Sequence, residues 1–227
     1  DLIAKEPSEV RSSSKLLVVQ EKLIDRTFAS ILDYLNEGDL LVLNDTKVFK
    51  ARLNANKVSG GKVEILLEKK LDEFSATAIT KSNRPLKEND LLLITGSDFT
   101  AVIEEKKEYL SKIRFSESLD KILDLYGSIP IPPYIKRESS SMDLDRYQTV
   151  YANEKKQRSS AAPTAGLHFD EALLSQIEDK GVDVAFITLD IGLGTFKPIS
   201  ENDFSKHRMH SEEIYISEST AELINKK

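Results

Sequence analysis

The chain has 227 residues, of which 40% are hydrophobic and 31% charged, so it has the composition of an ordinary globular protein with room for one large domain or two small ones. It contains no cysteine, which excludes disulfides and thiolate metal sites, and no apolar run approaches the roughly 20 residues of a membrane-spanning helix. The net charge of −6 weighs mildly against a nucleic-acid partner, although a local basic face remains compatible with it. No signal peptide is visible, and we expect a cytoplasmic protein.

The first segment combines helical and strand-like patterns. Apolar residues at helical spacing predict a helix beginning at Thr27, and residues 40–43 predict a strand buried on both faces. This strand ends in the polar residues Asn44, Asp45 and Thr46. Polar side chains at the carboxyl end of a buried strand often contact a ligand, but a plain Asx turn explains them equally well.

From residue 51 the pattern changes to short strand-like runs separated by turn residues. The runs lie at residues 62–68, 74–80, 91–94, 99–103 and 110–115. This spacing is typical of a small antiparallel barrel or sandwich. We therefore expect an α/β main domain made of residues 1–52 and 117–227, with a small antiparallel β-barrel domain, residues 53–116, inserted into it.

Residues 159–169 form an unusual run of small, nearly uncharged residues before a predicted helix. Gly166 permits a positive φ angle, and His168 follows it at the helix entrance. A loop that leads into a helix N-terminus is a common place for catalytic groups, which makes His168 a candidate for proton transfer. The alternative is a tight packing turn with His168 as a hydrogen-bonded core residue.

A glycine loop follows the predicted strand 182–189. It carries Asp190, Gly192, Gly194 and Thr195 and could wrap a ligand, although a lone G-x-G is weak evidence. Further on, His207, His210 and Glu212 could bind zinc or form a solvent-facing strand entry. We favour the second interpretation because no H-E-x-x-H pattern is present.

Basic and aromatic residues gather near residue 155. They are Lys155, Lys156 and Arg158, with Tyr134 and Arg137 earlier in the chain. Such groups could bind phosphates and stack on unpaired bases. Basic groups of this kind are usually solvated faces, and they would form a phosphate-binding face only if they converge in space.

Several ordered strings in the chain closely resemble one family, the S-adenosylmethionine:tRNA ribosyltransferase-isomerases of queuosine biosynthesis. The strings are LVLNDTK (41–47), ARL (51–53), PPYI (132–135), YQTVYA (147–152), AAPTAGLHF (161–169), GLGTF (192–196) and H-x-M-H-x-E (207–212). The chain differs at Asp190, where the family commonly has His, and at residues 158–160, where members usually carry Gly-Ser-Val. The family pattern also continues beyond Lys227.

The resemblance implies a transferase that moves the ribosyl part of S-adenosylmethionine onto 7-aminomethyl-7-deazaguanine at the tRNA wobble position, giving epoxyqueuosine, adenine and methionine. It implies a tRNA anticodon-arm partner and no metal, and we expect a monomer. His168 is our candidate base, with His210 and Glu212 as second candidates. The residues expected at the cofactor cleft are Asn44, Asp45, Arg52, Thr164, Gly166, Asp190, Gly192, Gly194 and Thr195. The residues expected to contact RNA are Lys155, Lys156, Arg158, Tyr134 and Arg137.

Two alternative functions remain. The first is an RNA-binding module without chemistry of its own, and the second is a metal-dependent hydrolase that uses His207, His210 and Glu212.

Overall fold

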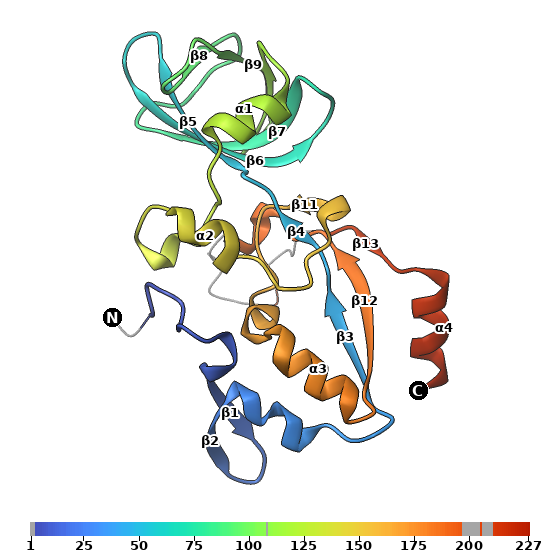
Figure 1. The fold of residues 1–227 in the computed structure, drawn as a ribbon. Coiled ribbons are helices and arrows are strands. Elements are labelled where there is room, and N and C mark those ends of the chain that lie inside the picture. The colour runs from blue at the N-terminus through green and yellow to red at the C-terminus, as the bar shows by residue number, and fades with distance from the viewer. Residues whose placement is uncertain (1–2, 108, 197–204, 206–210) are drawn as a thin grey trace.

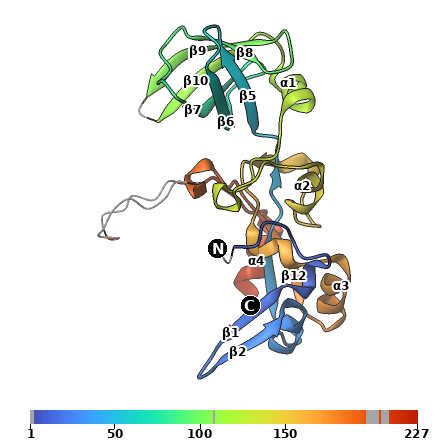
Figure 2. The same cartoon turned by 90° about the vertical axis from the view of Figure 1, so that its left-hand side faces the viewer.

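A computed structural model describes residues 3–107, 109–196, 205 and 211–227 of the chain, and it has a mixed α/β fold. A closed barrel lies at one end and the β1–β2 hairpin at the other, with a small parallel strand pair between them (Figures 1 and 2). Within the described residues, no helix has the length and apolar character that crossing a membrane would require.

The barrel consists of six strands in which every neighbouring pair is antiparallel, as the spacing of turn residues predicted. Its strands close in the order β10-β7-β6-β5-β8-β9. They are β5 (Arg52–Lys57), β6 (Lys62–Lys70), β7 (Ser75–Ser82), β8 (Leu91–Ile94), β9 (Thr100–Lys107) and β10 (Leu110–Phe115). Closure leaves no open sheet edge on which another chain could pair.

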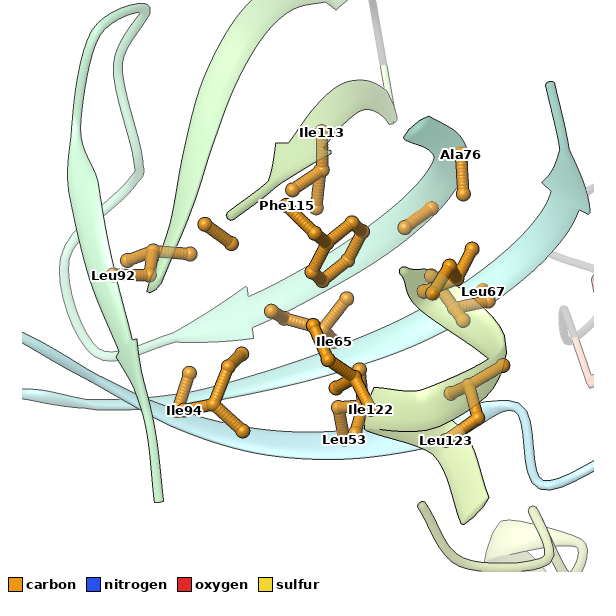
Figure 3. Close-up of a cluster of buried hydrophobic side chains, with 14 of the residues drawn as sticks. Leu53, Ile65, Leu67, Ala76, Leu92, Ile94, Ile113, Phe115, Ile122 and Leu123 are labelled. Atoms are coloured by element: carbon orange, nitrogen blue, oxygen red, sulfur yellow. The ribbon is translucent and has the colours of Figure 1, made fainter. Parts of the chain in front are cut away.

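Alternate residues of each barrel strand point inward. On β6 the buried residues are Val63, Ile65 and Leu67. Helix α1 (Leu119–Tyr126) closes the barrel by placing Ile122 and Leu123 in the same core (Figure 3). Leu119 of the same helix is also buried in this core. Burial of each large aliphatic side chain contributes about 1.5–3 kcal/mol. The packing therefore unites α1 with the barrel, whereas the sequence pattern placed residues from 117 onward in the main domain.

The central sheet is small. Strand β3 (Leu40–Asn44) pairs in parallel with β12 (Asp183–Leu189), and β13 (Ile214–Tyr215) adds an antiparallel edge. Helices α3 (Glu171–Asp179) and α4 (Glu218–Lys226) lie on opposite sides of the β3–β12 pair (Figures 1 and 2). Because parallel strands end at the same edge of a sheet, the residues after β3 lie beside those after β12.

The remaining elements are short. They are η1 (Arg11–Ser13), β1 (Lys15–Val19), β2 (Leu23–Thr27), η2 (Phe28–Tyr34), β4 (Lys47–Val48), η3 (Pro133–Ile135), α2 (Ser141–Arg146), η4 (Glu154–Lys156), β11 (Gln157–Ser159), η5 (Thr164–His168) and η6 (Leu193–Phe196). The helix expected from Thr27 is present, but as the 3₁₀ helix η2. Thr27 ends strand β2 and makes no side-chain capping bond, and the amide of Phe28 continues the hairpin by bonding Ser14 O.

Candidate functional site

Polar side chains meet where β3 and β12 end, and Asn44 and Asp45, two of the residues expected at the site, are among them. We call this group the strand-end cluster: Asn44, Asp45, Thr46, Lys156, Ser159 and Thr188. Asp45 is 5% exposed, and its two carboxylate oxygens accept bonds from Thr188 Oγ1 at 2.7 Å and Lys156 Nζ at 2.7 Å. A buried carboxylate needs such partners, because an unpaired charge away from water is costly.

The rest of the strand-end cluster joins the two strand ends to β11, at the start of the run of small residues 159–169. The Asn44 side chain accepts from Leu189 N at 3.0 Å and donates to Leu189 O at 3.0 Å. Thr46 Oγ1 lies 2.7 Å from Ser159 Oγ, which also accepts from Ile191 N at 2.8 Å. Asn44 therefore has a structural hydrogen-bond pattern, and Ser159 links β11 to the glycine loop.

The glycine loop follows the cluster directly. Gly192 N donates to Glu212 Oε1 at 3.3 Å, so two residues expected at the site from separate motifs lie together. A Cβ on Gly192 would meet no atom of the described residues within 4 Å, which leaves the backbone open to approach. Thr195 is exposed and its amide bonds Gly192 O at 3.3 Å. Gly194 lies in η6, and Asp190 N bonds Glu213 O at 2.9 Å.

The predicted loop around Gly166 is the 3₁₀ helix η5, which we call the His168 turn (residues 164–168). Gly166 is not among the described glycines with positive φ, so the turn does not use the left-handed conformation that glycine permits. Glycine is needed there for space: a Cβ would overlap Tyr151 Oη and lie 2.9 Å from Thr149 Cγ2. Thr164, at the start of the turn, is exposed.

His168 lies at the end of this turn, partly buried. Its ring centroid is 5.1 Å from that of Phe28, which also makes an edge contact with Phe169. Burial lowers the pKa of His168 below its ordinary value of 6.5. Within the described residues the ring nitrogens of His168 have no hydrogen-bond partner. The alternative in which His168 is a hydrogen-bonded core residue would require such a partner. The imidazole is therefore mainly neutral near pH 7 and has both nitrogens available.

Other predicted residues lie apart from these groups. Arg52 begins β5, where its Nη2 donates to Ile131 O at 3.3 Å and its Nε lies 3.8 Å from Glu64. The Arg137 guanidinium binds Asp143 through two bonds of 2.6 and 2.8 Å. Tyr134 is 53% exposed. His207 and His210 lie outside the described residues. Of the three residues that could bind zinc, the structure therefore describes only Glu212.

Lys155 and Lys156, adjacent in the sequence, have different environments. Lys155 is exposed, whereas the Lys156 ammonium is held by Asp45. Lys156 also borders a groove of about 590 Å³ between β12 and α4. The groove is lined by apolar side chains, including Phe186 and Ile216, and by the hydroxyls of Ser217, Ser219 and Thr220.

Sequence reasoning missed three residues that hold the site together. Thr188 lay unremarked inside a predicted strand, Lys156 was assigned to RNA, and Arg11 belonged to an ordinary polar run. Arg11 Nη1 donates to Leu167 O at 3.0 Å, directly before His168. No spacing pattern links residue 11 to residue 167, so only the fold reveals this contact.

Comparisons with known proteins identify the relatives of the chain. A family model described as "Queuosine biosynthesis protein" matches residues 1–227. The S-adenosylmethionine:tRNA ribosyltransferase-isomerase of Acinetobacter baumannii (strain AYE) is 43% identical over 226 residues, 99% of this chain and 66% of the relative. The enzyme of that name from Legionella pneumophila (strain Lens) is 45% identical over 96% of this chain and 64% of its own. The chain thus spans about two thirds of the length of these relatives.

A solved structure is also similar. It is the S-adenosylmethionine tRNA ribosyltransferase from Thermotoga maritima, which is 25% identical, with a TM-score of 0.38 and coverage of 99% of this chain and 61% of that one.

Proposed function

Because the chain belongs to the queuosine biosynthesis protein family, we propose that it carries the reaction of an S-adenosylmethionine:tRNA ribosyltransferase-isomerase. The ribosyl part of S-adenosylmethionine is transferred to 7-aminomethyl-7-deazaguanine at the tRNA wobble position and isomerised to epoxyqueuosine. Adenine and methionine leave. The names of relatives that are 43% and 45% identical across nearly the whole chain support this proposal.

The observation that carries the proposal is the His168 turn. The positive sulfur of S-adenosylmethionine makes the neighbouring C5′ proton removable, and a neutral base must be placed against that carbon. Two observations support His168 as this base: burial lowers its pKa, and its ring nitrogens are unpartnered among the described residues. The small residues before it allow close approach of a ligand to the backbone.

The remaining site residues are proposed for binding. Asp190, Gly192, Gly194 and Thr195 would hold the ribose or methionine groups of the substrate, and the contact between Gly192 and Glu212 brings a second candidate base to this loop. His210 is proposed beside it on the family motif alone. Asn44, Asp45, Thr164 and Gly166 would shape the same cleft, and Arg52, whose side-chain contacts are with Ile131 and Glu64, is proposed there on the family motif alone.

For the tRNA, the exposed side chains of Lys155 and Tyr134 support a contact face. Arg158 is proposed on its position in the sequence. Lys156 and Arg137 would join this face only at the edges, because Asp45 and Asp143 already hold their charged groups. We further propose that the protein acts as a monomer.

The barrel is proposed to be an insertion in the α/β domain. Two observations support this: β3 and β12, from either side of the barrel in sequence, pair with each other, and Arg52 and Ser128 exchange backbone bonds of 3.1 and 2.9 Å. The chain therefore enters and leaves the barrel at one place. The packing of α1 favours an insertion that ends near Gly127 rather than at residue 116.

The function is tested by mixing the purified chain with S-adenosylmethionine and precursor-containing tRNA and measuring released adenine. We expect the rate to fall as the pH falls through the His168 pKa, below 6.5, because protonation removes the base. His168→Gln should lower turnover about 10²–10⁴-fold and remove this acid limb. Absence of adenine release from the unmodified chain would refute the proposed activity, whereas full turnover by His168→Gln would refute only the assigned base.

A further inference from the structure

We infer that Arg11 is a positioning residue that fixes the His168 turn, an inference that rests on the proposed function of His168. Arg11 lies in η1, close to the N-terminus, and η1 packs against η5. Its role would be to hold the backbone from which the candidate base projects, without touching the substrate.

One guanidinium connects two separate backbone segments. Arg11 Nη1 donates to Leu167 O at 3.0 Å, and Arg11 Nη2 donates to Asp145 O at 2.9 Å. Nη1 also lies 3.5 Å from Arg146 O. Leu167 directly precedes His168, while Asp145 and Arg146 form the last turn of α2. The two segments are thus held at a fixed separation by one planar, permanently charged group.

Both segments need an external donor. The last carbonyls of an α-helix have no partner inside the helix, and α2 is only six residues long. A 3₁₀ turn such as η5 is short and has poorer hydrogen-bond geometry than an α-helix. Hydrogen bonds from a charged donor are stronger than neutral ones, so Arg11 supplies what each segment lacks.

Side chains around the His168 turn also restrict its position. Phe28 packs against the His168 ring from η2, and Tyr151 and Thr149 leave no room behind Gly166. The charged groups around Arg11 are Arg146 and the carboxylates of Asp145 and Asp170. Removal of the Arg11 contact would free the carbonyl side of the turn, so that the His168 ring could shift away from the Phe28 ring. The His168 ring would then become more solvated and lose its fixed direction.

The test compares Arg11→Gln and Arg11→Lys with Arg26→Gln. Arg26 is a matched control, since its guanidinium bonds only the neighbouring Asp25 O in the exposed hairpin, among the described residues. The first readout is the NMR titration of the His168 Hε1 resonance, assigned by its loss in His168→Gln. In Arg11→Gln we expect the resonance to shift and its midpoint to rise toward about 6.5, the value of an exposed histidine. Arg11→Lys, which keeps a charged donor, should give an intermediate midpoint.

The second readout is the kinetics of adenine release. Displacement of a catalytic group by about 1 Å costs up to the order of 10²-fold in rate, so we expect kcat to fall about 10–100-fold in Arg11→Gln with little change in KM. Arg26→Gln should match the unmodified chain in both readouts. An unchanged His168 titration in a folded Arg11→Gln chain overturns the inference. If that variant does not fold, a wild-type midpoint in Arg11→Lys overturns it instead. The NMR readout remains decisive even if no adenine is released, so failure of the proposed function is recognised separately.

Discussion

At Gly166 the backbone passes so close to two side chains that any Cβ must displace one of them. Gly166→Ala should destabilise the protein by about 1–3 kcal/mol, because the new methyl group overlaps Tyr151 Oη and lies 2.9 Å from Thr149 Cγ2. Tyr151→Phe removes the overlapping oxygen and should therefore recover part of the loss. The measurement is a double-mutant cycle of urea unfolding on the wild type, both single variants and the double variant.

The cycle also separates steric overlap from backbone conformation. Strictly additive free energies of unfolding would show that the Tyr151 hydroxyl does not limit the space at Gly166. Because Gly166 is not in the positive-φ region, Ala brings no conformational strain that could obscure this comparison.

Single residues show clearly what a sequence can and cannot predict. The run of small residues predicts close approach of the backbone to a ligand or to packed side chains, and Gly166 lies against Tyr151 and Thr149. The residue type alone does not tell whether glycine is needed for space or for a positive φ, because both needs select it. His168 stood out because the chain has only three histidines. Arg11 and Thr188 did not, because their partners Leu167 and Asp45 are more than 100 residues away in the chain.

Among the elements, the sequence patterns predicted the presence of strands and helices better than they predicted the exact type of each element. The apolar run at residues 40–43 became β3, and the period-two runs became the barrel strands. The helical stripe after Thr27 became a 3₁₀ helix, which begins at Phe28 directly after strand β2. The parallel pairing of β3 with β12 joins segments on either side of the barrel and has no local signal.

The junction of β3 and β12 should depend on one buried carboxylate. Asp45→Ala removes the acceptor for both Thr188 Oγ1 and Lys156 Nζ, and we expect a loss of about 1–3 kcal/mol in the free energy of unfolding. The lower part of this range applies if the Lys156 ammonium turns to water, since its side chain is 37% exposed. Urea unfolding measures the change.

A neighbouring ion pair provides the control. Glu154 lies in η4, the same short helix as Lys156, and its carboxylate pairs with Lys47. The Glu154 side chain, however, is 80% exposed. Glu154→Ala should therefore cost less than about 1 kcal/mol. An equal or larger effect of Glu154→Ala would contradict the structural importance assigned to Asp45.

At the scale of the whole molecule, the barrel and the central sheet have separate hydrophobic cores. The barrel core contains buried residues from Phe49 to Leu123 only, whereas the sheet core is built around Phe28, Leu43 and Ile177. An exposed contact between them is the Lys69–Glu213 ion pair of 2.5 Å. Such an exposed pair contributes little to stability, so the barrel is held mainly by its own packing.

The fragment 49–128 should accordingly fold on its own. Its two ends are joined by the reciprocal backbone bonds between Arg52 and Ser128, and Lys50 Nζ donates to Asp124 O at 2.9 Å. A fragment that ends at residue 116, the boundary predicted from the sequence, lacks Leu119, Ile122 and Leu123 and exposes the core surface that they cover. Loss of these three buried side chains costs about 1.5–3 kcal/mol each, and the total is comparable with the roughly 5–15 kcal/mol by which a small domain is stable. Circular dichroism with thermal unfolding should therefore show a cooperative transition for 49–128 and none for 49–116. Equal stability of the two fragments would instead assign α1 to the main domain, and an unfolded 49–128 would show that the barrel needs the central sheet to fold.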